Sequence, residues 1–520
     1  MSSEALFASP RRPTATLAIF VGFAVLVSFF YALGRTPLFD VDEGAFSQAT
    51  VEMFQRNDFL SPYLNGEPRY DKPILVYWLQ AFSVKMLGVR EFAFRFPSAL
   101  CAAGWVLLIY LFSRRRYGVD TALLAAGIAA MSLGVYIIGR AATADALLNM
   151  LIGAAMFAAW LRIETGRRLW LYVTFAAIGF GFLAKGPVAI LVPGSVSFAF
   201  CILRRDYKTW TRMVFDPLGL LLFAAIALPW YVIILQREGW AFVEGFFFKH
   251  NLSRFSGPLQ GHAGSLLYYF PVVLIGTLPF TSLLLPVIKN WRTIWRDDLQ
   301  CYLLLWFAFV FLFFSLSGTK LPHYILYGMS GLFILMALYA SQLRSAFVAL
   351  VPALLFFVFL LALPAIVSAL LPHVPDDYYR EALADADQYF TPFYYVYAAI
   401  AAGVTVWLMV ERRLPMRGKL VAVGLIAVIA LSSFVIPFAG NVQQQPIKEA
   451  ALLSRAKHYD VVMWRLNAPS FSVYYGRPTP SHEPGHGDVI ITKLKRLAQL
   501  EGLQYEVLYA KNGIVLARID

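Results

Sequence analysis

LFDVDEGAFSQATVEMFQRNDFLSPYLNGEPRYDKPILVYWLQ, residues 38–80, is a polar stretch between a hydrophobic segment that ends near Leu33 and another that begins near Phe92. Three acids stand together at its start, Asp40, Asp42 and Glu43. Two cations flank a carboxylate near its end, in the run Arg69, Tyr70, Asp71 and Lys72. A long polar segment held against a membrane usually has a function. We therefore expect the rest of the chain to be the scaffold for this stretch.

The composition indicates a polytopic α-helical membrane protein. Of the 520 residues, 59% are hydrophobic and 14% are charged, which is too apolar for a soluble globular protein. Apolar runs of roughly 17 to 25 residues are long enough to cross the hydrocarbon as helices. We predict about thirteen transmembrane helices, near residues 14–33, 92–112, 121–138, 144–161, 169–184, 186–203, 218–235, 266–288, 299–316, 321–340, 346–371, 393–410 and 420–438. The first run lacks a small-residue cleavage site and is expected to remain as a span.

Positive charges mark every second connection between the predicted spans. Lys and Arg cluster at residues 114–116, 162–168, 204–212, 289–296, 344 and 412–419, on the same side as Arg11 and Arg12. Because cytoplasmic loops carry the excess of Lys and Arg, we expect a cytoplasmic N-terminus and an outer C-terminus. The net charge of +13 then reflects topology and does not indicate nucleic acid as a partner. All the unusual polar clusters fall on the outer side.

Short helices and a small domain are expected outside the membrane. Phe46, Ala49 and Met53 recur at helical spacing, which predicts an interfacial helix in the first outer loop, residues 34–91. Residues 74–87 and 240–250 predict two more. After residue 440, helical segments at 448–457 and 494–500 alternate with strands at 460–464 and 488–491 and a hairpin at 505–519. We predict a membrane domain over residues 1–440 and a small extracytoplasmic α/β domain over residues 441–520.

The acids have a structural interpretation and a functional one. Asp40 could cap the following helix and Glu43 could close a capping box, which leaves Asp42 unexplained. A carboxylate at the boundary of water and membrane can take a proton from a hydroxyl nucleophile or hold a divalent cation. Asp145, at the start of a later span, could simply favour the positive end of its helix. Its expected position on the same face as Asp42 makes it a second candidate.

The cationic run also has two interpretations. It could be a surface turn with a weak ion pair. Alternatively, Lys72 as a point charge, with Arg69 or Tyr70 donating hydrogen bonds, could seat a phosphate. Because an apolar interfacial helix follows, the run is placed to meet a lipid phosphate. More donors lie at the outer ends of later spans, namely Arg254, Lys320, His323 and Tyr324.

Some of these features have simpler explanations. Lys320 could merely snorkel to the headgroups, and His323 could merely cap a helix. The turn Lys185-Gly186-Pro187 is predicted to be structural. The three cysteines lie in or beside apolar spans and are expected to be inert buried thiols. Residues 482–486, HEPGH, match a zinc-site pattern, but its Pro and Gly disfavour the helix that such a site needs.

As a set, these motifs resemble the membrane glycosyltransferases of the C fold, the superfamily of protein O-mannosyltransferases and bacterial aminoarabinose transferases of lipid A. The resemblance covers about residues 10–340 and rests on the Asp-Glu pair, Asp71-Lys72-Pro73, Lys185-Gly186-Pro187, and the runs 250–255 and 317–324, in that order. The predicted spans and outer domain look closer to the bacterial lipid-modifying branch. However, aminoarabinose enzymes carry an Arg-Tyr pair where Ala45 and Phe46 stand here, which leaves the sugar and the acceptor open.

The resemblance implies a transferase in a bacterial inner membrane that takes a sugar from a polyprenyl phosphate and gives it to a lipid, glycan or protein hydroxyl on the periplasmic side. It implies that Asp42 is the catalytic carboxylate, that Lys72, Arg254 and Tyr324 contact the phosphate, and that Asp71 and Asp145 give polar support or contact a divalent metal. Together with the residue patterns, the predicted catalytic set is Asp42, Glu43 and Asp145. The predicted phosphate ligands are Arg69, Tyr70, Lys72, Arg254, Lys320, His323 and Tyr324.

Two other functions use the same residues. A transporter or flippase of a lipid-linked sugar would need the cations but no base, although the sequence shows no inverted repeat of the transporter kind. A family member without activity would bind the lipid-phosphate sugar and do no chemistry. These alternatives stay open at the level of sequence.

Overall fold

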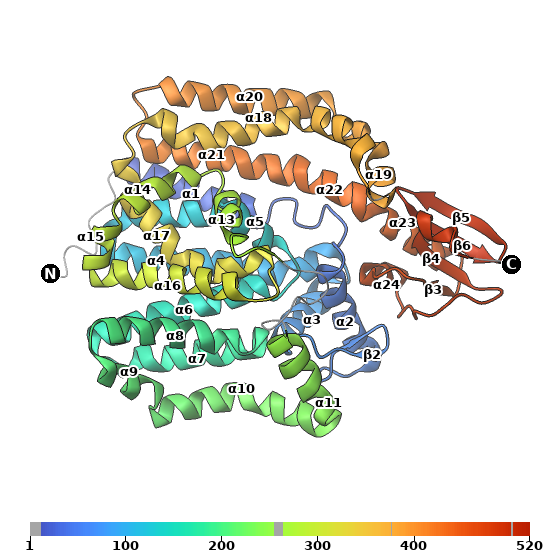
Figure 1. Cartoon of the computed structure of the whole chain (residues 1–520), viewed down its shortest axis with the longest axis horizontal. Helices are drawn as coiled ribbons and strands as arrows, with labels where there is room; N and C mark the ends of the chain where they lie inside the picture. The colour runs from blue at the N-terminus through green and yellow to red at the C-terminus, as the bar shows by residue number, and fades with distance from the viewer. Residues whose placement is uncertain (1–11, 254–263, 376, 501–502) are drawn as a thin grey trace.

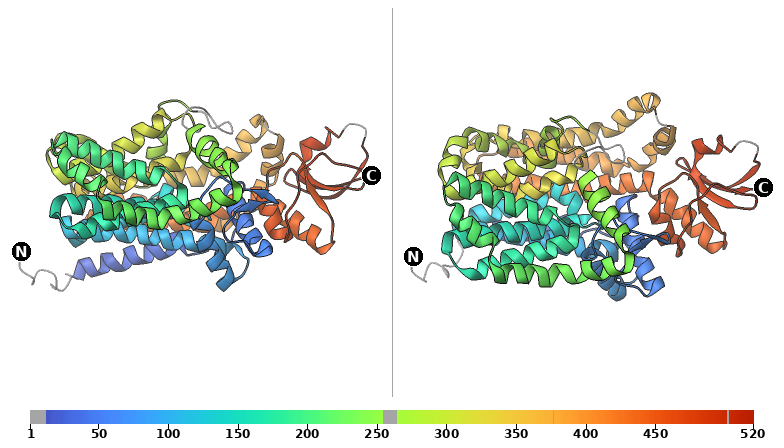
Figure 2. Two further views of the ribbon diagram at one scale, coloured as in Figure 1. Left: turned by 90° about the horizontal axis from the view of Figure 1, so that it is seen from below. Right: turned by 60° about the horizontal axis from the view of Figure 1, so that its bottom comes forward.

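The protein is a bundle of long helices with a small α/β domain at one end (Figure 1). The computed structural model describes residues 12–253, 264–375, 377–500 and 503–520. The long helices run along the longest axis, and the two chain termini lie at opposite ends of that axis (Figures 1 and 2). Helices α2 and α3 lie between the bundle and the C-terminal domain. The predicted outer loop therefore sits where bundle and domain meet.

The bundle consists of helices joined by short connections. In the first half these are α1 (Arg12–Phe29), α4 (Glu91–Met131), α5 (Leu133–Arg140), α6 (Asp145–Thr165), α7 (Arg168–Lys185), α8 (Val188–Leu203), α9 (Tyr207–Val214), α10 (Pro217–Glu238) and α11 (Trp240–Val243), which continues into a π-helix (Glu244–Leu252). In the second half they are α13 (Tyr269–Gly276), α14 (Leu284–Lys289), α15 (Trp291–Arg296), α16 (Asp298–Leu316), a 3-10 helix (Pro322–Gly328), α17 (Met329–Tyr339), α18 (Ala346–Leu370), α19 (Asp377–Ala384), α20 (Pro392–Val410), α21 (Met416–Ala430) and α22 (Ile436–Gln443). Helices α6 and α17 are apolar on all sides because neighbours surround them.

The chain is a multi-pass membrane protein. Among the described residues, nine helices are long and apolar enough to cross a membrane, or ten if the pair Tyr269–Gly276 and Thr281–Lys289, bent by 115°, is one span. Helix α4 has 41 residues, about 60 Å if straight and twice the hydrocarbon thickness, and Gly118 breaks it with φ 81° and ψ 170°. It thus contains one predicted span and most of a second. The count of thirteen remains a prediction.

The first outer loop folds as the hydrophobic periodicity predicts. Residues Asp42–Arg56 form α2, and Leu75–Leu87 form α3. Between them, the short strands β1 (Tyr63–Leu64) and β2 (Glu67–Pro68) form a hairpin. Glu52 of α2 accepts the backbone N–H groups of Asn65 and Gly66 at 2.6 and 3.0 Å. This contact fixes the turn that leads to the cationic run.

The C-terminal domain has one four-stranded mixed sheet of order β3-β4-β6-β5. Its elements are α23 (Gln445–Ala456), β3 (Val461–Met463), α24 (Pro469–Tyr475), β4 (Val489–Lys493), α25 (Leu494–Leu497), β5 (Tyr505–Lys511) and β6 (Ile514–Ile519). Alternate residues of β4 face α23 and α24 on one side and α25 on the other, so both faces of the sheet are covered. Sequence periodicity predicts all of these elements except α24. The predicted boundary at residue 440 falls within α22.

Candidate active site

A buried ion pair holds the loop that carries the acids. Arg95 of α4 donates from Nε to Glu43 Oε1 at 2.8 Å and from Nη2 to Glu43 Oε2 at 2.6 Å. Its Nη1 also donates to the carbonyls of Leu33 and Thr36. Both side chains of the pair are about 5% exposed. Because a bidentate Arg–carboxylate pair is geometrically specific, the end of α1 is locked to the start of α2.

The same carboxylate reaches the second acidic segment. Glu43 Oε1 accepts the backbone N–H of Ala142 at 2.7 Å, and Oε2 accepts that of Phe39 at 2.8 Å. Asp42 precedes Glu43 in the chain, and Asp145 follows Ala142 at the start of α6. Glu43 therefore sets the relative position of the two segments that carry Asp42 and Asp145.

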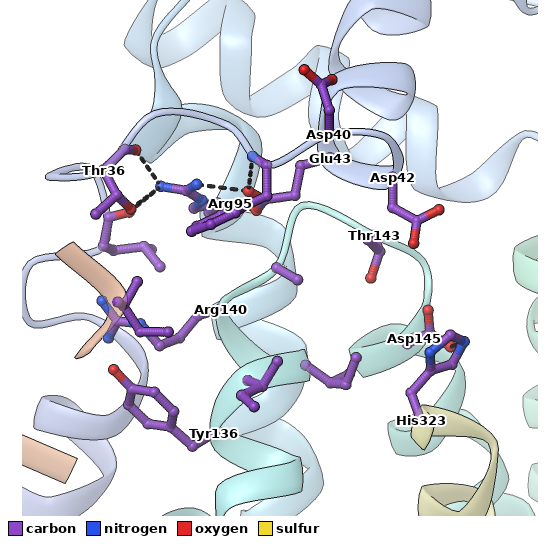
Figure 3. Close-up of a pocket in the computed structure, with 16 residues that line it drawn as sticks. Thr36, Asp40, Asp42, Glu43, Arg95, Tyr136, Arg140, Thr143, Asp145 and His323 are labelled. Carbon is purple, nitrogen blue, oxygen red and sulfur yellow. Dashed lines mark hydrogen bonds and ion pairs between the residues drawn. The ribbon is translucent and has the colours of Figure 1, made fainter. Parts of the chain in front are cut away.

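Asp42 lies at a cavity of about 250 Å³ between α2, the start of α6 and the 3-10 helix that begins at Pro322. Its carboxylate points toward Thr143, Asp145 and His323, whereas Asp40 points away from this space (Figure 3). Within the described part of the chain, the Asp42 carboxylate makes no hydrogen bond or ion pair. The buried hydroxyl of Thr143, in the wall of the same cavity, also lacks a hydrogen-bond partner there. Both groups are available to a bound molecule.

Asp145, in contrast, is surrounded by donors. Its Oδ1 accepts from Lys185 Nζ at 2.5 Å and from the Tyr327 hydroxyl at 2.9 Å. The His323 Nε2 lies 3.7 Å from the same oxygen. Lys185 ends α7 and also lies 5.5 Å from the ring of Tyr324. Residues from three separate helical segments, namely α6, α7 and the 3-10 helix Pro322–Gly328, thus meet at one carboxylate.

The cationic run, residues 69–72, does not line this cavity and is held by contacts of its own. Arg69 is largely buried, donates from Nε to the Tyr77 hydroxyl at 2.9 Å and lies 3.5 Å from Asp71. Lys72 Nζ donates to the carbonyl of Asp71 at 3.0 Å. The Tyr70 hydroxyl donates to Glu238 at 2.9 Å, and burial raises the pKa of Tyr70 to about 12, so it remains a neutral donor. Arg69 and Tyr70 are therefore already engaged with protein groups.

Electrostatic interactions connect the cationic run with the acids. Asp145, Lys185, Asp42 and Lys72 all act electrostatically on His323. Asp42 acts in the same way on Arg69. Because interactions between charges extend over roughly 10 Å, the base candidate and the cationic run lie in the same region of the protein.

Of the other predicted phosphate ligands, two are buried and one lies outside the described residues. Lys320 is buried, and its Nζ donates to the Ser317 carbonyl at 2.6 Å rather than snorkelling to the surface. Tyr324 is buried next to Lys185 and 4.8 Å from the His323 ring. Arg254 lies outside the described residues, so its predicted contact with phosphate remains a prediction.

The described side chains do not fit a metal centre. Nowhere in the described ranges do three or more His, Cys, Asp or Glu side chains group closely enough to hold a metal ion. Asp71, the predicted metal contact, lies beside Arg69 instead. A site of hard-cation type needs several oxygen ligands, so we derive no chemical step through a metal.

Sequence reasoning missed four of the groups that build this site. Arg95, Thr143 and Tyr327 carried no signal apart from position, because each lies within an apolar span or at its end. Lys185 was expected to be part of a structural turn, yet it contacts Asp145. The capping expectation for Asp40 is wrong, because helix α2 has no side-chain cap and Asp40 bonds instead to Ser470.

Comparison with known proteins agrees with this architecture. The sequence model of the family described as dolichyl-phosphate-mannose-protein mannosyltransferase matches residues 71–233. An uncharacterized protein of Aquifex aeolicus is 31% identical over 322 residues, which are 61% of this chain and 72% of that protein. The undecaprenyl phosphate-α-4-amino-4-deoxy-L-arabinose arabinosyl transferase of Aeromonas hydrophila is 34% identical over 61% of this chain, and that of Yersinia enterocolitica is 33% identical over 62%. This chain spans only 58% and 59% of the length of those two transferases.

Solved structures share the fold. ArnT from Cupriavidus metallidurans bound to undecaprenyl phosphate has a TM-score of 0.79 and 20% identity, with 97% of this chain and 98% of that chain covered. The Archaeoglobus fulgidus oligosaccharyltransferase in the apo form has a TM-score of 0.52 and 12% identity, with 93% and 70% covered. The architecture is that of a C-fold membrane protein. The chain belongs to the C-fold membrane glycosyltransferases, the superfamily of protein O-mannosyltransferases and bacterial aminoarabinose transferases.

Proposed function

We propose that this protein transfers a sugar from a polyprenyl phosphate, of the undecaprenyl type, to an acceptor hydroxyl. The observation that carries the proposal is that Asp42, which makes no hydrogen bond within the described residues, shares a cavity with His323, and that Lys72 and Asp42 both act electrostatically on His323. A base and a phosphate seat on opposite sides of one space are what such a transfer requires. The names of the relatives and the shared fold support the donor class.

The proposed reaction is a single displacement. The acceptor oxygen forms a bond to the anomeric carbon while the bond from that carbon to the phosphate oxygen breaks. Asp42 accepts the proton of the attacking hydroxyl, and the electron pair of the broken bond stays on the lipid phosphate. The configuration of the anomeric carbon inverts, and no covalent enzyme intermediate is needed.

The lipid phosphate becomes a better leaving group when its charge is neutralised. In our proposal Lys72 supplies this charge as a point cation, with Arg254 as a second ligand. Arg69 and Tyr70 hold the wall of the seat through Tyr77 and Glu238 rather than contacting phosphate directly. Lys320 supports the neighbouring turn through Ser317.

Asp145 has a different proposed role from Asp42. It holds Lys185, Tyr327 and His323 beside the donor and keeps these groups oriented toward the phosphate side of the cavity. Glu43 acts through Arg95 and Ala142 and is a positioning residue. The Thr143 hydroxyl is available to donate to the sugar.

The sugar and the acceptor are narrower proposals. The names of the relatives give an undecaprenyl phosphate sugar as donor, and we propose a lipid acceptor such as lipid A from the resemblance to the bacterial lipid-modifying branch. Ala45 and Phe46, which replace the Arg-Tyr pair of aminoarabinose enzymes, are buried, and the Phe46 ring packs against Tyr77 at a tilt of 34°. We therefore propose that residues other than these two select the sugar. The site is assigned to the periplasmic face of a bacterial inner membrane, with the N-terminus in the cytoplasm, from the distribution of Lys and Arg.

Reconstitution in liposomes tests the proposal against the flippase alternative. Undecaprenyl phosphate carrying each of several radiolabelled sugars is supplied with lipid A, a glycan and a peptide as acceptors. A transferase moves the labelled sugar to an acceptor and releases undecaprenyl phosphate. A flippase moves label across the bilayer and releases none, and a binding protein without activity does neither.

A further inference from the structure

The C-terminal domain touches the first outer loop at two places. Helix α24 lies against the start of α2, ahead of Asp42 (Figure 1). The segment after α24 lies against the β1–β2 hairpin, ahead of the cationic run. Residues that are more than 400 positions apart in the chain therefore meet on both sides of the proposed site.

The first contact is made by Ser470. Its backbone N–H donates to Asp40 Oδ1 at 2.8 Å, and its hydroxyl donates to Asp40 Oδ2. Ser470 is 1% exposed. A Cβ added at Gly44 would lie 2.1 Å from Asp40 Oδ1 and 2.5 Å from Ser470 N, so only glycine fits between the two segments.

Neighbouring groups extend this contact. Tyr474 of α24 accepts the backbone N–H of Leu38 at 2.8 Å and donates to Glu91 at 3.2 Å. Lys448 of α23 pairs with Glu91 at 2.5 Å. Val473 belongs to a buried apolar cluster with Leu38 and Val51 of the outer loop and Phe94 of α4. The interface is therefore both packed and hydrogen-bonded.

The second contact reaches the other half of the loop. The backbone N–H of Thr479 donates to the side chain of Asn65 at 3.3 Å, and Gln55 donates to the carbonyl of Gly476 at 3.1 Å. Asn65 lies in the turn that Glu52 holds, four residues before Arg69. One short segment of the C-terminal domain thus braces both halves of the loop.

We propose that Ser470 is a positioning residue for the transfer reaction, which fixes Asp42 by holding Asp40 two residues earlier. This inference rests on the proposed function of Asp42. Because a displacement of about 1 Å at a reacting group can reduce a rate 100-fold, a contact two residues away is close enough to matter. Asp40 itself faces away from the cavity, so it is not a catalytic residue (Figure 3).

Ser470→Ala and Ser472→Ala form a matched pair for the test. Both serines are buried in α24, but the Ser472 hydroxyl bonds to Thr479 within the domain at 2.9 Å. We expect Ser470→Ala to lower kcat roughly 10-fold without changing the affinity for undecaprenyl phosphate, Ser470→Thr to restore most of the rate, and Ser472→Ala to keep the wild-type rate. Asp40→Ala combined with Ser470→Ala should be no worse than Asp40→Ala alone, since Asp40→Ala already removes both hydrogen bonds to Ser470.

Hydrogen exchange gives a readout that does not depend on activity. The amides of Leu38, Gly44 and Ala45 are hydrogen-bonded in the wild type. We expect Ser470→Ala, but not Ser472→Ala, to speed their exchange. The proposal is overturned if these amides exchange equally fast in Ser470→Ala and Ser472→Ala. It is also overturned if the losses of kcat caused by Asp40→Ala and Ser470→Ala multiply in the double variant. If the exchange difference is found but wild-type protein transfers no sugar from any donor, the brace stands and the transferase function fails.

Discussion

Two carboxylates face the same cavity, and their surroundings differ completely. Asp42, at the start of α2, makes no hydrogen bond within the described ranges, and Asp145, at the start of α6, accepts from Lys185 and Tyr327 with His323 nearby. Each is the first residue of its helix, so the local context of the two is similar. The difference comes from the segments that fold against each of them.

This difference assigns the chemistry. A carboxylate saturated with donors is a poor base, because its lone pairs are occupied and its charge is balanced. A carboxylate without such partners can receive a proton from a substrate hydroxyl. Asp42 is therefore the base in our account, and Asp145 organises cations. The predictions that follow test this division of roles.

The largest expected effect is that of Asp42→Asn. An amide cannot accept the proton, so kcat should fall by about 10²- to 10⁴-fold. Undecaprenyl phosphate should bind at least as tightly as to the wild type, because a negative charge facing it is removed. Asp58→Asn is the control, because Asp58 lies in the same loop and pairs with Arg237 at the surface. The assay is single-turnover transfer with the sugar donor that the wild type uses. A variant with near-normal turnover refutes Asp42 as the base.

Glu43→Gln should destabilise the fold more than any surface change. It leaves Arg95 charged and buried without its carboxylate, and breaking one side of a buried pair costs about 3–5 kcal/mol. Arg465→Gln, which breaks the exposed pair with Glu483, should cost less than about 1 kcal/mol. Thermal unfolding in detergent compares the two. Equal melting temperatures would mean that Glu43 does not lock the loop.

Asp145→Asn should strengthen the binding of undecaprenyl phosphate and slow turnover. Without the negative charge, Lys185 and His323 attract an anion more strongly, so undecaprenyl phosphate should bind several-fold tighter. Turnover should fall, since Lys185 loses the partner that orients it. Lys185→Ala should instead weaken binding. If Asp145→Asn lowers turnover as much as Asp42→Asn does, the two acids do not have separate roles.

Lys72→Ala should weaken binding of undecaprenyl phosphate about 10-fold, the loss expected for one charge-assisted hydrogen bond. The salt dependence of binding should also become shallower. Lys85→Ala, an exposed lysine on α3, is the matched control. Binding that is equally weakened by both changes would indicate general attraction to the anionic lipid rather than a seat.

A further expected effect concerns pH and stability. Burial raises the pKa of Asp40 to about 7. The hydrogen bonds from Ser470 lower this pKa, and the charge of Glu43 raises it further. The folded protein then holds a proton that the unfolded chain releases near pH 4, so this contribution to stability is lost as pH rises toward 7. We expect the melting temperature of Asp40→Asn to rise relative to that of the wild type as the pH increases from 4 to 7. A constant difference over that range contradicts the shift.

Much of the fold was readable from sequence, because apolar runs and their spacing determine helices directly. The helix of Phe46, Ala49 and Met53 and the hairpin ending at Ile519 were predicted from local periodicity. Contacts between residues that are far apart in the sequence were not predicted. Nothing near Arg95, Tyr327 or Ser470 indicates that they meet Glu43, Asp145 and Asp40, because these contacts depend on packing between distant segments. Likewise, Lys185 looked like part of a turn until α7 placed it beside α6.

The most direct test of the account is a structure of this protein with undecaprenyl phosphate bound. We predict that the phosphate oxygens lie within hydrogen-bonding distance of Lys72 Nζ and that the Asp42 carboxylate faces the free oxygen to which the sugar would be attached. A phosphate that binds away from Lys72, with Asp42 on the far side of the protein from it, would contradict the central claim that the base and the phosphate seat serve one substrate.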